Sequence, residues 1–88
     1  MPVGLNGVWG SYINGQQVVM QIQGNQYQMW MNGMPYEAGL FQVQGNVLQG
    51  RTSAGVVFSN YILVNPNGME FMLTDMQTGI SVVYQRIQ

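Results

Sequence analysis

The sequence contains no cysteine, no histidine and no lysine. Without cysteine, no disulfide bond can stabilise this small chain and no thiolate can act as a nucleophile. Histidine and cysteine are also the usual ligands of transition metals, so we expect no metal site. Together with lysine, they supply many of the general bases and covalent nucleophiles of enzymes. We therefore predict a non-enzymatic protein with no catalytic residues and no cofactor.

Charge is also scarce. The charged side chains are Glu37, Arg51, Glu70, Asp75 and Arg86, and the formal net charge is −1. Domains that bind nucleic acid normally carry a basic face, so we expect no nucleic-acid partner. The three carboxylates fall on separate predicted strands or strand ends, which disfavours the carboxylate pair of a glycoside hydrolase. We assign Asp75 to capping the turn that follows it.

Long apolar runs are missing as well. None approaches the ~20 residues that a membrane-spanning helix needs. The start of the chain shows no basic segment followed by an apolar run, so we expect no signal peptide in this sequence. Its polarity comes mainly from Gln, Asn, Ser and Thr, which favours an extracytoplasmic domain, periplasmic or secreted. A length of 88 residues predicts one domain over residues 1–88.

Turn signals, in contrast, are frequent and evenly spaced. Asn-Gly pairs at 14–15 and 32–33 suit two-residue hairpin turns. Similar signals follow at 24–25, 45–46, 54–55, 65–68 and 78–79. A spacing of about 8–12 residues is typical of all-β sandwiches and barrels. The strands that fit between the turns span residues 8–13, 16–23, 26–32, 36–44, 47–53, 56–64, 69–76 and 80–87.

Eight strands joined by tight turns predict an all-β fold, a small antiparallel up-and-down (meander) barrel. Closing the barrel removes both sheet edges, which would otherwise promote aggregation. Trp9 opens the first strand and Arg86 closes the last, so the two would meet at the seam of a closed barrel. We read them as a plug that seals one barrel end.

Alternation of apolar and polar residues assigns an inner and an outer face to each strand. The inner face includes large side chains, namely Met20, Tyr27, Met29, Met31, Phe41, Tyr61 and Phe71. Because an eight-stranded barrel is just wide enough to be filled by its own side chains, a filled interior is favoured over a large cavity. The residues 56–64 are apolar on both faces, and alternation there favours Val57, Ser59, Tyr61 and Leu63 as the inner set.

Several short motifs carry a resemblance to a known family. They are Gly7-Val8-Trp9, Gly39-Leu40-Phe41, Gly45-Asn46-Val47-Leu48, Tyr61-Ile62-Leu63, Asp75-Met76-Gln77-Thr78-Gly79 and the late Arg86. In this order they resemble small bacterial lipocalin-like domains of the calycin superfamily, which includes lipocalins, fatty-acid-binding proteins and avidins. The resemblance covers nearly the whole chain. It implies a barrel in which Trp9 packs across the closed end against Arg86. The turns are shorter than the loops that help to enclose ligands in lipocalins and avidins.

Two functions follow from a weakly charged barrel. The first is a binding module that takes a small apolar or planar ligand at the barrel mouth. Its candidate lining residues are Tyr12, Tyr27, Asn60, Tyr61 and Tyr84. A cavity of ~300 Å³ or more would support this function, whereas a solid interior would support the second.

The second function is a structural or protein-interaction module that self-associates through an apolar outer wall. An outward tryptophan is a large apolar anchor, and lysine, which discourages association of sheets, is missing. We therefore expect a homo-oligomer or a protein partner. The candidate interface residues are Val19, Trp30, Phe58, Ile62, Val64, Met72 and Val83.

Overall fold

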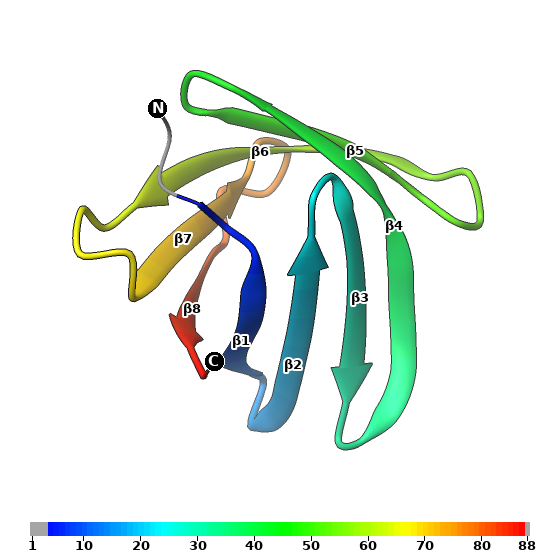
Figure 1. Cartoon of the computed structure of the whole chain (residues 1–88). Coiled ribbons are helices and arrows are strands. Elements are labelled where there is room, and N and C mark those ends of the chain that lie inside the picture. Colours follow the sequence, from blue (N-terminus) through cyan, green and yellow to red (C-terminus); the bar gives the residue numbers. More distant parts are fainter. Residues whose placement is uncertain (1–3, 88) are drawn as a thin grey trace.

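The computed structural model describes residues 4–87, which form eight strands and no helix. In chain order the strands are β1 (Gly7–Ile13), β2 (Gln16–Gln23), β3 (Gln26–Met31), β4 (Met34–Gln44), β5 (Val47–Thr52), β6 (Val57–Val64), β7 (Glu70–Asp75) and β8 (Ser81–Arg86). Each pairs antiparallel with the next, and β8 pairs with β1, so the sheet closes into a barrel (Figure 1). The predicted fold class is confirmed. No described segment is a helix suited to crossing a membrane.

The hairpin turns have the backbone geometry that the Asn-Gly pairs predict. Asn14 and Gly15 have φ angles of 53° and 79°, and Asn32 and Gly33 have angles of 51° and 82°. Two consecutive positive φ values are the mark of a type I′ turn, whose twist matches that of the flanking strands. These two turns fix the pairing of β1 with β2 and of β3 with β4.

The seam between the first and last strands is short. Trp9 lies opposite Arg86 in the register of β1 and β8. Next to this pair, the backbone N–H of Ile87 donates a hydrogen bond to the carbonyl of Val8 over 2.7 Å. Figure 1 shows the last strand, β8, lying between β7 and β1. The two ends of the sheet therefore meet, as the positions of tryptophan and arginine predict.

The longest strand, β4, bends so that it serves two neighbours (Figure 1). Residues 34–40 pair with β3 and residues 39–44 pair with β5. Gly39 belongs to both ladders, and a Cβ there would overlap the backbone of Arg51 and Thr52. The bend therefore depends on a residue without a side chain.

The inner face of β6 differs from the prediction. Phe58 lies opposite Gly50 and Asn60 lies opposite Leu48, which places both on the inner face. Ile62 is 6% exposed, whereas Leu63 is 67% exposed. Alternation fails on β6 because both of its faces are apolar, so a shift of one residue leaves the pattern almost unchanged.

Gly50 explains why Phe58 points inward. It lies on the inner face of β5, and a Cβ at this position would overlap the ring of Phe58. The missing side chain therefore leaves the space that the ring occupies. The predictions that Phe58, Ile62 and Val64 form an outer interface are wrong, because all three belong to the hydrophobic core or pack against it.

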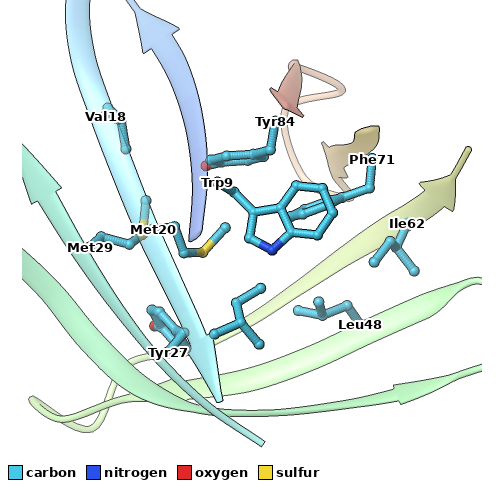
Figure 2. Packing of buried hydrophobic residues seen from close by; sticks show 10 residues of the cluster. Trp9, Val18, Met20, Tyr27, Met29, Leu48, Ile62, Phe71 and Tyr84 are labelled. Atoms are coloured by element: carbon cyan, nitrogen blue, oxygen red, sulfur yellow. The ribbon is translucent and has the colours of Figure 1, made fainter. Parts of the chain in front are cut away.

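Three aromatic rings of the core pack together where β1, β7 and β8 meet (Figure 2). Trp9 is fully buried and packs edge-on against Phe71, with the ring centroids 4.6 Å apart. Phe71 in turn stacks on Tyr84 with centroids 5.1 Å apart. Offset and edge-to-face ring pairs add to the stabilisation that burial itself provides. This aromatic stack fills one side of the barrel interior.

Candidate functional site

The other side of the interior holds a cavity of about 580 Å³. The sequence-based prediction of a filled interior is therefore wrong. Two inner positions of β4 and β5 are Gly39 and Gly50, which contribute no side chain. The Phe58 ring lies over Gly50 and the Tyr27 ring lies beside Gly39, so these rings rest against the barrel wall.

Three of these rings form a group along one wall. Tyr27 lies with its ring centroid 6.3 Å from that of Phe41 and 5.9 Å from that of Phe58. Met20 and Met29 line the same cavity from the adjoining strands β2 and β3. Rings and thioethers are polarizable apolar surface, which suits contact with an apolar or planar molecule.

The polar groups of the cavity are few. The Tyr27 hydroxyl donates a hydrogen bond of 2.7 Å to Oε2 of Glu37. Burial, together with this bond and the negative charge of Glu37, raises the pKa of Tyr27 well above its usual value. Burial, followed by the charge of Glu37 and by Tyr36, raises the pKa of Tyr84 to about 12.

A second carboxylate lines the cavity near the turn between β7 and β8. Oδ1 of Asp75 accepts hydrogen bonds from the backbone N–H groups of Gln77 and Thr78, over 2.7 and 3.1 Å. The sequence predicts this capping of the turn. Asn60 lies opposite Asp75 in the pairing of β6 with β7 and lines the same cavity.

One end of the barrel forms the mouth of the cavity. At this end β2, β4, β6 and β8 begin, and the apolar side chains of Tyr36, Val56 and Ile80 line the cavity while remaining exposed. An apolar rim at the mouth of a barrel is a common setting for small-molecule entry. The rim therefore marks the side from which a ligand would reach the interior.

The opposite end is closed by Trp9 and Arg86. The guanidinium carbon of Arg86 lies 4.3 Å from the Trp9 ring centroid, within the range of a cation–π contact. Arg86 also donates hydrogen bonds to the carbonyls of Gly68, Asn6 and Gly4 over 2.8, 2.8 and 3.1 Å. This arginine thereby ties the N-terminal segment and the β6–β7 turn to the barrel end.

The tyrosines predicted to line the ligand site separate into two groups. Tyr27 and Tyr84, together with Asn60, line the cavity. Tyr12 and Tyr61 do not, because they are 74% and 50% exposed and do not belong to the core. Their assignment to the ligand site is wrong. On β6 the one-residue shift in register turns Tyr61 to the outer face, and on β1 the side chain of Ser11 is buried while that of its neighbour Tyr12 points outward. Tyr12 instead borders a hollow of about 640 Å³ along the outer seam of β1 and β8.

Other lining residues were missed from the sequence. They include Tyr36, Glu37, Phe58 and Asp75. A usable signal exists for Glu37, because alternation from Phe41 and Gly39 places it on the inner face of β4. In the structure it lies opposite Met29 and diagonally from Tyr27. A carboxylate among inner positions of a strand is rare enough to indicate a site.

The remaining residues predicted for the outer wall lie in two separate places. Val19 and Trp30 are cross-strand neighbours on β2 and β3 and are partly exposed. Met72 and Val83 are neighbours on β7 and β8. These two pairs lie on strands that do not adjoin, so they form two patches instead of one wall.

Comparison with known proteins adds no identification. No protein-family model, curated protein or solved structure matches the chain. Within residues 4–87, no group of three or more Asp, Glu, His or Cys side chains is arranged to hold a metal ion. The chemistry of the candidate site therefore follows from its cavity, rings and carboxylates.

Proposed function

We propose that this protein is a non-enzymatic, lipocalin-like binding module that takes one small, mostly apolar ligand into the barrel interior. The observation that carries the proposal is the cavity of about 580 Å³. Small-molecule sites are typically clefts or cavities of ~300–1,000 Å³ with apolar walls and a few polar groups. The barrel interior has this size and this composition.

The geometry of the two barrel ends supports the same function. Trp9 and Arg86 close one end, while the exposed rim of Tyr36, Val56 and Ile80 surrounds the other. A ligand would enter past the rim and lie against the rings of Tyr27 and Phe58. Its apolar surface would then leave water, which is the main source of favourable free energy in such a site.

The neutral dye N-phenyl-1-naphthylamine tests this proposal, because its emission rises in apolar surroundings. We expect saturable binding of one dye per chain. Asn60→Phe places a ring in the cavity and should weaken binding by about tenfold or more, since it removes room for the dye. Ser59→Phe adds the same ring on the opposite face of β6 and should leave the affinity unchanged. Equal effects of the two substitutions would contradict interior binding.

Self-association is a second candidate, supported by the apolar row that Leu63, Met72 and Val83 form across β6, β7 and β8. Leu63 and Val83 are exposed in the single chain. A net charge of −1 gives little repulsion between copies. Light scattering should then show a dimer or larger species at tens of micromolar, and Leu63→Glu should yield a folded monomer. A monomer before any substitution would dismiss this candidate.

A further inference from the structure

Among residues 4–87, the cavity lining contains negatively charged side chains but no positively charged one. Glu37 and Asp75 both line it. The two arginines are elsewhere: Arg51 is exposed on β5, and Arg86 stacks on Trp9 at the closed end. Within the described part of the chain, the interior therefore presents carboxylate oxygens to a ligand with no cationic side chain in the lining to offset them.

One of these carboxylates is hydrogen-bonded to a tyrosine of the cavity lining. Tyr27 donates its hydroxyl hydrogen to Oε2 of Glu37, and Tyr36 precedes Glu37 on β4. Tyr84 lines the same cavity from β8, with its ring stacked on Phe71. Tyr27, Tyr36 and Tyr84 all line the cavity. A carboxylate and aromatic rings that line one apolar cavity suit an organic cation, because both attract positive charge.

We propose that the ligand of this barrel is an organic cation, with an alkylammonium head that lies at Glu37 beside Tyr27 and an apolar body that fills the rest of the cavity. This inference rests on the proposed function, because it requires that the interior binds a ligand. It goes further by stating the charge of that ligand. Ammonium groups with methyl substituents fit best, because they carry charge and apolar surface together.

The physical reason is the low polarity of the cavity. Most of its lining is apolar, so interactions between charges are screened less than in water. An ammonium head gains attraction to the carboxylate of Glu37 and to the negative faces of the tyrosine rings. A carboxylate ligand would instead meet like charge from Glu37 and Asp75. The cavity therefore discriminates against fatty acids and favours cationic amphiphiles.

Three probes with the same decyl chain separate charge from apolar contact: decyltrimethylammonium, 1-decanol and decanoate. Their affinities are measured at neutral pH by displacement of N-phenyl-1-naphthylamine. We expect the ammonium to bind at least about tenfold more tightly than the alcohol, and decanoate to bind more weakly than the alcohol. Binding of the alcohol without a preference for the ammonium would overturn this inference and leave the proposed function standing. If none of the three probes binds, both this inference and the proposed function are overturned.

Matched substitutions locate the charge responsible. Glu37→Gln keeps an oxygen that can accept the hydrogen bond from the Tyr27 hydroxyl. It should lower the preference for the ammonium over the alcohol by about tenfold, because the negative charge is gone. Glu70→Gln removes the same charge from the outer face of β7 and should leave the preference unchanged. Asp75→Asn keeps the turn cap and should reduce the preference by about threefold. If Glu37→Gln fails to fold, Asp75→Asn still tests the inference. An equal loss of the preference for the ammonium in Glu70→Gln would contradict the inference.

Discussion

Replacing Trp9 by alanine is expected to lower the free energy of unfolding by ~3–5 kcal/mol, the range for truncation of a large buried aromatic side chain. The Trp9 side chain is fully buried, and its indole N–H donates a hydrogen bond of 2.8 Å to the carbonyl of Leu5. Its ring also contacts Phe71 and Arg86. Small domains have a total stability of about 5–15 kcal/mol, so this loss would leave the barrel marginally folded.

Urea denaturation followed by circular dichroism measures the effect, and the second tryptophan supplies the control. Trp30 lies partly exposed on the outer face of β3, so Trp30→Ala should cost only about 1 kcal/mol. The same variant leaves Trp9 as the only tryptophan, and its emission should be that of an indole shielded from water. Equal losses in the two variants, or water-exposed emission from Trp9, would contradict the sealed barrel end.

On β6, truncation of two neighbouring residues is expected to have very different effects. Ile62→Ala should destabilise the protein by ~2–5 kcal/mol, because it removes a side chain that is 6% exposed and leaves a gap in the core. Leu63→Ala removes a similar volume from a side chain that is 67% exposed and should change stability by ~0.5 kcal/mol or less.

Thermal or urea unfolding of the two variants decides which face of β6 points inward. The comparison is internally controlled, because both substitutions remove a branched apolar side chain from adjacent positions of one strand. The inward register of Phe58, Asn60 and Ile62 requires the larger loss at position 62. A larger loss at position 63 would support the alternation predicted from the sequence and would remove Phe58 and Asn60 from the cavity wall.

The strand order and most strand boundaries could be predicted from the sequence, because turn residues carry local information. Asn14-Gly15 and Asn32-Gly33 adopt the backbone angles that their residue types favour. Inner faces were also predictable where apolar and polar residues alternate, as on β2 and β3. The meeting of Trp9 with Arg86 follows from closing an ordered meander.

Local patterns could not settle β6 or the cavity. The register of β6 depends on a contact between distant residues: the ring of Phe58 uses the space above Gly50, a residue on the neighbouring strand. The volume of the interior depends on how rings from several strands lie against one another, which alternation does not describe. Glu37 was overlooked as a site residue because its role depends on Tyr27 across the hairpin.

The methionines provide the most direct test of whether a ligand occupies the barrel interior. Met20 and Met29 line the cavity, whereas Met34, which is 70% exposed, and Met69 lie outside its lining. Their ¹³C-labelled methyl groups, assigned with Met→Leu variants, can be followed by NMR during titration with 1-decanol. Interior binding predicts saturable shifts of Met20 and Met29, with Met34 and Met69 unchanged. Shifts confined to Met34 and Met69, or no shifts at all, would contradict a binding site inside the barrel.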